Sequence, residues 1–283
     1  MKRVRDYLEL SKSRIVAMVL VTTAAGYFFG AVHVSLALLI NTLVGTALVA
    51  AGTNALNQYV ERDLDARMRR TRMRPLPDGR IKPRAALLFS IAISVAGTAY
   101  LALMVNLLTA ALGAFTLITY IFIYTPLKRR STACTLIGAV PGAVPPLMGW
   151  TAATGALGLG GWIAFGIVFL WQLPHFLAIA WIYREDYARA GFPMLPVIEP
   201  DGRSTARQAC VYAAALLPVS LAPTLTGLDS TTYFYGALAL SLIFLLLTLQ
   251  FARTRSIPDA RRLFFGSIIY LPLLWIVMIA GRL

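Results

Sequence analysis

Cysteine and histidine are scarce in this chain of 283 residues, which contains two of each. Cys134 and Cys210 are far apart and have no disulfide-framework or metal-ligand spacing. The C-x-x-C-H motif that attaches haem covalently is missing. The sequence therefore excludes a disulfide-stabilised fold and covalent haem attachment, and we expect both cysteines to be small apolar fillers.

Acidic residues are also few, with 12 Asp and Glu against 26 Lys and Arg and a formal net charge of +14. Such a balance is found in nucleic-acid-binding proteins, but here the basic residues flank long apolar runs. Basic residues in that position orient membrane helices and contact anionic lipid. We therefore expect the lipid bilayer as a partner and no nucleic acid.

Hydrophobic residues make up 58% of the chain, and the mean hydropathy is +0.71. Repeated apolar runs of about twenty residues are typical of membrane-spanning helices. The sequence predicts an all-α, polytopic membrane protein with a single domain over residues 1–283. The nine predicted transmembrane helices cover residues 15–32, 34–59, 84–104, 107–125, 133–153, 161–183, 207–227, 231–252 and 263–281.

The charge distribution predicts the topology. Every Lys and Arg except Arg282 falls in the N-terminal segment or in alternate connections between the predicted spans. The positive-inside rule then places the N-terminus in the cytoplasm, the C-terminus in the periplasm, and two longer cytoplasmic loops near 62–83 and 184–206. The first span is too long for a signal-peptide core, and no transit peptide is evident, so we expect a bacterial plasma (inner) membrane.

One face of the second predicted helix is polar. Asn57, Glu61 and Asp65 fall within roughly 80° of one another on a helix, with Asn54 between them. Amides that continue this face into the membrane cost free energy unless they have a polar partner. Asp63 points elsewhere if the helix continues, or approaches the same site if the helix ends near Arg62.

Basic residues that follow this face have the chemistry to bind a diphosphate. Arginine forks grip phosphate oxygens, and Mg2+ prefers to be shared between carboxylates and phosphates. An alternative is a solvated salt-bridge lattice at a helix end, with the remaining arginines serving only as topology determinants. The candidate diphosphate-binding residues are Asn54, Arg67, Arg70, Arg74, Lys128 and Arg129; the candidate metal ligands are Glu61, Asp63, Asp65, Glu185 and Asp186.

Two further spans contain unusual residues. Pro141, Pro145 and Pro146 interrupt the fifth span, which indicates an interior cavity, close helix packing through Gly138 and Gly142 at four-residue spacing, or both. The sixth span contains His175, which is one of the two histidines and lies at membrane depth, with Trp171 and Gln172 nearby. An ionisable group there indicates function, although a neutral histidine bonded to backbone or to Gln172 is the simpler alternative.

The chain resembles the UbiA superfamily of intramembrane prenyltransferases. The first motif of this superfamily is an Asn and two acids spaced four residues apart, and Asn57, Glu61 and Asp65 of this chain are similar to it. The branch of this superfamily that acts on haem is similar in several further strings, which are spread over residues 68–196. These are Met68-x-Arg70-Thr-x-x-Arg74-Pro-Leu76, Tyr124-Thr-Pro-Leu-Lys128-Arg129, Trp171-Gln-x-Pro-His175-Phe176 and Asp186-Tyr-x-x-Ala-Gly191-x-Pro-Met-Leu-Pro196.

The resemblance implies nine helices around a central cavity, with Mg2+ as the ion. It also implies farnesyl diphosphate and haem b as substrates, and haem O as a product handed over to haem A synthase or a terminal oxidase. The implied catalytic residues are Asn57, Glu61, Asp65 and Asp186, and His175, Gln172 and Trp171 are expected to contact haem. Ala190 stands where the wider superfamily often has a second acid, which leaves the number of ions open.

Two other functions fit part of this pattern. A UbiA-type prenyltransferase for a quinone precursor or chlorophyllide would use the same acidic helix, but we would not expect it to carry the string from Trp171 to Phe176. A non-catalytic haem transporter would also use a broken span and a buried polar face. Such a transporter would not release diphosphate.

Overall fold

The structure, a computed structural model, describes residues 2–281, and within this range every regular element is helical. The elements are α1 (Lys2–Leu10), α2 (Ser13–Gly30), α3 (Leu36–Asp65), α4 (Pro83–Met104), α5 (Leu107–Ile118), a π-helix η1 (Thr119–Tyr124), α6 (Thr125–Leu127), α7 (Cys134–Thr154), α8 (Leu159–Ile182), α9 (Arg184–Arg189), α10 (Leu195–Ile198), α11 (Arg203–Leu225), α12 (Thr231–Thr254) and α13 (Ile257–Ala280).

Within residues 2–281, nine helices are long and apolar enough to cross a membrane, with α5, η1 and α6 forming one continuous span. Each corresponds to one of the nine predicted spans, so the predicted fold class is confirmed. Several helices extend beyond their apolar runs: α3 continues to Asp65, α11 begins at Arg203 and α13 begins at Ile257. Hydropathy does not predict these polar helix ends, because it detects only the apolar residues that lie in the hydrocarbon core of the membrane. Arg282 lies outside the described residues.

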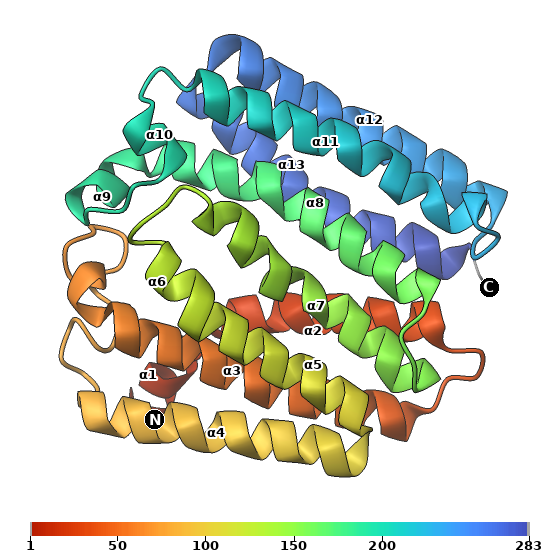
Figure 1. Cartoon of the computed structure of the whole chain (residues 1–283), viewed down its shortest axis with the longest axis horizontal. Coiled ribbons are helices and arrows are strands. Elements are labelled where there is room, and N and C mark those ends of the chain that lie inside the picture. Colours follow the sequence, from red (N-terminus) through yellow and green to blue (C-terminus); the bar gives the residue numbers. More distant parts are fainter. Residues whose placement is uncertain (1, 282–283) are drawn as a thin grey trace.

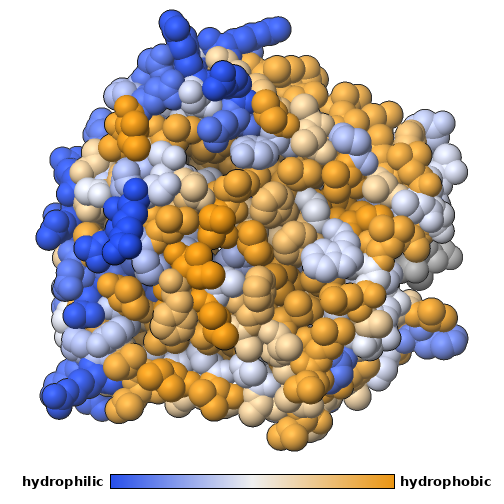
Figure 2. All heavy atoms as spheres, viewed as in Figure 1, coloured by the Kyte–Doolittle hydropathy of each residue, from blue (hydrophilic) through white to orange (hydrophobic). Residues whose placement is uncertain are grey.

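The long helices pack as roughly parallel and antiparallel neighbours (Figure 1). The helix α2 packs along α7, α3 packs along α4, and α8 contacts α7, α11 and α13. The short helices α9 and α10 lie at the upper left of Figure 1 and α1 lies at the lower left, and we call this left-hand side of the molecule the α1 end. Figure 2 shows hydrophilic residues along the same margin and a hydrophobic surface across the middle, as expected for a membrane-embedded body.

The helices α2 and α7 approach each other through two glycines. A Cβ atom on Gly26 would lie 1.9 Å from the Pro146 carbonyl oxygen, and one on Gly149 would lie 1.9 Å from the Thr23 carbonyl oxygen. Only glycine permits such backbone contact. Of the nine spans, α7 has the largest buried share, 67% of its most apolar window. The interrupted fifth span is thus packed closely against α2 through Gly149, whereas Gly138 and Gly142 lie against the side chains of Tyr124 and Gln172.

Candidate active site

The polar face of α3 is buried at the α1 end. Asn54, Asn57, Glu61 and Asp65 are 8%, 2%, 3% and 0% exposed. Asp63 does not join them: its side chain is 78% exposed and lies 3.7 Å from the Arg62 guanidinium. The reason is that α3 remains helical through Asp65, which turns Asp63 away from the face shared by Glu61 and Asp65.

Each buried carboxylate of this face has a cationic partner from a different element. The Lys128 ammonium lies 3.2 Å from both carboxylate oxygens of Glu61. Arg74 Nη1 donates a 2.7 Å hydrogen bond to Asp65 Oδ2. The loop after α3 is folded back by Thr71, whose hydroxyl donates a 2.8 Å hydrogen bond to the Asp65 carbonyl oxygen. Arg74 and Lys128, of the basic residues predicted to bind diphosphate, therefore face the acids directly.

A π-helical turn places Thr125 and Lys128 beside the polar face of α3. In η1 and the residue after it, the chain winds more widely, and the Thr125 hydroxyl donates to the Tyr120 carbonyl oxygen at 2.8 Å. The same hydroxyl oxygen accepts a 3.3 Å hydrogen bond from Asn57 Nδ2. Lys128 follows three residues later. Single π turns occur frequently at functional sites, and apolar patterning gives no signal for them.

Lys12 is a site residue that our sequence analysis missed. Gln58 Nε2 holds the end of α1 by donating to the carbonyl oxygens of Glu9 and Leu10 at 3.1 and 2.8 Å. The chain then turns at Lys12 in a left-handed conformation (φ 52°, ψ 56°), which costs roughly 1 kcal/mol or more for a residue with a side chain. This turn places Lys12 Nζ 3.0 Å from Asn57 Oδ1. In the sequence Lys12 was indistinguishable from a topology determinant.

The other predicted basic residues lie farther out. The Arg70 guanidinium covers the rings of Tyr183 and Tyr187 at 5.0 and 5.6 Å and donates to the Tyr187 hydroxyl at 3.3 Å. Arg67 and Arg129 are exposed, and the structure does not bring either of them to Glu61 or Asp65. Arg70 is thus at the rim of the cluster, held against α9 and the end of α8.

The second acidic pair does not join the cluster either. Asp186 is buried but forms an ion pair with Arg189 on its own short helix, and Glu185 is exposed. Among residues 2–281, no three Asp, Glu, His or Cys side chains are close enough to hold a metal ion together. Of the five candidate metal ligands, Glu61 and Asp65 therefore lie in the cluster, while Asp63 is turned away by helix phase, Asp186 pairs with Arg189 and Glu185 is exposed.

Glu61 and Asp65 alone still suit a cation that is shared with a phosphate. Asp65 Oδ1 is buried and has no hydrogen-bond partner among the described residues. Mg2+ is usually bound by one or two carboxylates together with substrate phosphates and water, not by a closed protein cage. The donor set fits such an ion, with Asp65 Oδ1 as an available ligand.

The charge of this cluster favours an anion. Three cations, Lys12, Arg74 and Lys128, surround two carboxylates. Burial, with help from nearby Arg74, lowers the pKa of Lys12 to about 7, against the opposing effect of Glu61. For Lys128, burial is the largest single effect and lowers the pKa, but Glu61, Tyr187 and Tyr120 together outweigh it and the net shift is upward. An incoming diphosphate would relieve the repulsion among these cations.

A second group of side chains lies deeper, between α8 and α13. The His175 ring is stacked between Trp171 and Phe264, with centroid distances of 5.3 and 5.0 Å. Its Nδ1 atom lies 2.7 Å from the Ser267 hydroxyl. Gln172 does not belong to this group, because it donates to the Ala139 carbonyl oxygen of α7 at 2.7 Å. Three residues separate Gln172 from His175, enough for α8 to turn them toward different neighbours.

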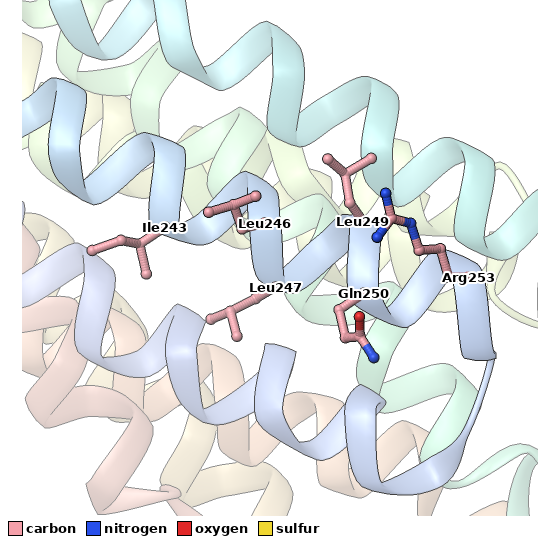
Figure 3. Close-up of a pocket in the computed structure, with 6 residues that line it drawn as sticks. All are labelled: Ile243, Leu246, Leu247, Leu249, Gln250 and Arg253. Atoms are coloured by element: carbon pink, nitrogen blue, oxygen red, sulfur yellow. The ribbon is translucent and has the colours of Figure 1, made fainter.

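Two surface grooves lie away from these groups. A groove of about 820 Å³ is lined by apolar residues of α3, α4, α5 and η1, including Leu56, Tyr59 and Val60. These three residues lie on a different face of α3 from Glu61 and Asp65. A smaller groove on α12 contains none of the candidate residues (Figure 3). It is lined by Ile243, Leu246, Leu247, Leu249, Gln250 and Arg253.

The fold and the α1-end cluster together define a helical membrane protein with a buried group of acidic and basic side chains suited to a diphosphate. The comparison with known proteins is consistent with this class: the model of the UbiA prenyltransferase family matches residues 19–270. The chain belongs to this family.

Relatives of known name cover nearly the whole chain. It is 50% identical to a protein from Solibacter usitatus named protoheme IX farnesyltransferase, covering 98% of this chain and 99% of that protein. A protein of the same name from Koribacter versatilis is 45% identical, with 98% and 93% covered.

Solved structures share the fold at low sequence identity. A digeranylgeranylglyceryl phosphate synthase structure superposes with a TM-score of 0.83 at 17% identity, covering 99% of both chains. A UbiA homologue from Archaeoglobus fulgidus bound to GPP and Mg2+ superposes with a TM-score of 0.72 at 19% identity, covering 96% of this chain and 99% of that one. These likenesses show the common arrangement of helices.

Proposed function

We propose that this protein transfers a farnesyl group from farnesyl diphosphate to a vinyl group of haem b, with addition of water, and releases haem O and diphosphate. The near full-length similarity to proteins named protoheme IX farnesyltransferase supports the choice of substrates. The single observation that carries the chemistry is the pair of buried carboxylates at the end of α3, each held by a cation.

In this proposal the cluster stabilises the leaving group. Arg74, Lys128 and Lys12 bind the diphosphate oxygens, and Asn57 orients Lys12 through the hydrogen bond described above. Preorganised cations aimed at developing negative charge are worth several kcal/mol in a water-excluded site. Mg2+, bound through Glu61 and Asp65 together with the substrate, would supply further charge neutralisation. Because Asp186 is held by Arg189, the proposal rests on the two acids of α3.

The second group, at His175, lies at a different depth. His175 lies seven residues before the end of α8, which is about 10 Å of helix from the α1 end. A substrate held near His175 therefore reaches the cluster only if it is large or if the farnesyl chain bridges the two. Haem and a fifteen-carbon chain have the required size, whereas a small aromatic acceptor does not.

For the membrane arrangement, we propose that the α1 end faces the cytoplasm of a bacterial inner membrane, with the C-terminus in the periplasm. The basic residues of the connections at this end support the assignment through the positive-inside rule. The product haem O would then pass to haem A synthase or a terminal oxidase within the same membrane.

The test is direct. Purified protein in lipid nanodiscs is incubated with haem b, farnesyl diphosphate and magnesium, and the porphyrin product is identified by mass. The expected product carries one hydroxyethylfarnesyl group in place of a vinyl group. Prenylation of a quinone precursor or chlorophyllide but not of haem would contradict the proposed acceptor. Haem binding without any release of diphosphate would indicate the transporter instead.

A further inference from the structure

The environment of His175 contains a hydrogen-bond chain that decides which ring nitrogen carries the proton. The Ser267 hydroxyl lies 2.5 Å from the Phe264 carbonyl oxygen, one turn earlier in α13. A carbonyl oxygen accepts only, so the single hydroxyl proton of Ser267 points toward Phe264. The Ser267 oxygen is then left as an acceptor for its second neighbour.

That neighbour is Nδ1 of His175, at 2.7 Å. Because the Ser267 oxygen accepts, Nδ1 must be the protonated nitrogen. In a neutral imidazole the other nitrogen, Nε2, then carries a lone pair. Within residues 2–281, Nε2 of His175 has no hydrogen-bond partner, although the ring is half-buried at membrane depth.

The ring is also fixed in orientation. Trp171 and Phe264 stack on it at interplanar angles of 25° and 30°. Trp171 is itself anchored, since its Nε1 atom donates a 2.8 Å hydrogen bond to the Ser267 carbonyl oxygen. Ser267 is 0% exposed. One residue of α13 therefore holds both aromatic rings of α8, by its hydroxyl and by its carbonyl.

We propose that Ser267 is a positioning residue that holds His175 in the Nδ1–H form and presents Nε2 as an axial ligand to the iron of the haem substrate. This inference rests on the proposed function. A histidine that binds metal through one nitrogen commonly donates its other N–H to an oxygen, which fixes the tautomer and raises the basicity of the ligand. Ser267 supplies that oxygen.

The first experiment measures iron coordination in the purified protein loaded with haem b. Resonance Raman spectroscopy of the ferrous form reports the iron–histidine stretch. We expect this band in the wild type and in Ser267→Thr, a shifted band in Ser267→Ala, and no band in His175→Ala. The haem dissociation constant should rise about tenfold in Ser267→Ala, the usual size of an effect on a residue that supports a ligand.

Ser90→Ala is the matched control. Ser90 is also 0% exposed, and its hydroxyl also donates to the carbonyl oxygen three residues earlier, Leu87, at 2.9 Å. This substitution removes the same kind of back-bond without an imidazole partner. It should leave both the band and the haem dissociation constant unchanged.

A second experiment keeps the test independent of how well Ser267→Ala folds. In His175→Gly, added imidazole should restore the coordination band and bind more tightly than 1-methylimidazole, because only imidazole can donate to Ser267. This preference should disappear in the His175→Gly/Ser267→Ala double variant.

An unshifted band in Ser267→Ala, or an equal preference in the two glycine variants, would overturn the role of Ser267. A band that persists in His175→Ala would overturn the ligand assignment. Either result leaves the proposed function standing if the wild type still converts haem b to haem O. If the wild type neither binds nor converts haem, the proposed function itself fails.

Discussion

Lys12 and Asn57, 45 positions apart, are joined by a 3.0 Å hydrogen bond from the lysine ammonium to the asparagine side-chain oxygen. The contact brings the junction between α1 and α2 to the polar face of α3. It adds a third cation to the cluster in which Arg74 and Lys128 already face the two carboxylates. This excess of cations over carboxylates is why we propose that the cluster binds an anion and is not a closed salt-bridge lattice.

Lys12 should make diphosphate binding dependent on pH. Its pKa is lowered to about 7 by burial, so much of it is neutral at pH 8, and a bound anion favours the charged form. Binding of inorganic diphosphate should therefore weaken as the pH rises above about 7. Lys12→Met should bind more weakly and lose this part of the pH dependence. Calorimetric titration of both proteins between pH 6 and pH 9 measures the difference.

The lowered pKa of Lys12 also makes the free energy of unfolding depend on pH. Between its folded pKa of about 7 and the ordinary value of 10.5, Lys12 binds fewer protons in the folded state than in the unfolded state. The free energy of unfolding should therefore rise with pH through this window, and the rise should be smaller in Lys12→Met. Arg129→Met, which removes an exposed charge nearby, serves as the control. An identical pH profile in all three proteins would contradict the assignment.

Lys128 and Arg129 are adjacent but should differ sharply in importance. Lys128 contacts both oxygens of Glu61, whereas Arg129 is exposed. Lys128→Met should lower the rate of prenyl transfer by about 100-fold, the typical cost of losing one preorganised donor to a developing anion. Arg129→Met should stay within about threefold of the wild type. Single-turnover assays with farnesyl diphosphate distinguish the two; equal losses would show that the arrangement of the loop is misassigned.

The packing of α2 on α7 should be intolerant of a single methyl group. In Gly149→Ala, the new Cβ would meet the Thr23 carbonyl oxygen, so the helices would have to separate. Overpacking of this kind costs about 1–3 kcal/mol or more. Gly166→Ala is the matched control, because its Cβ would meet only a methyl group of Val219 at 3.3 Å. Thermal unfolding in detergent should show a clear decrease in Tm for Gly149→Ala only.

The spans and the polar face of α3 could be predicted because each depends on residues close together in sequence. Twenty apolar residues specify a membrane helix almost by themselves, and Asn57, Glu61 and Asp65 share a face by helix geometry alone. The partners could not be predicted in the same way. Which of the many basic residues reach the acids depends on how the loop after α3 and the π turn before Lys128 fold back.

Two residues have other partners than the sequence indicated, each for its own reason. Asp186 was expected beside the acids of α3, but a basic residue one turn away on α9 is a nearer partner. Gln172 was expected beside His175, but α8 lies between α7 and α13, and each residue contacts a different neighbour. Ser267 had no signal in the sequence, because one buried serine in an apolar span is common.

The central claim is that buried Glu61 and Asp65, with their cations, release the diphosphate. The most direct measurement is the rate of haem O formation by Asp65→Asn and by its neighbour Asp63→Asn, each purified and shown to be folded. Asp65→Asn should lose at least about 100-fold in rate, while Asp63→Asn, whose side chain is 78% exposed, should stay near the wild-type rate. A folded Asp65→Asn protein that makes haem O at the wild-type rate would contradict the claim.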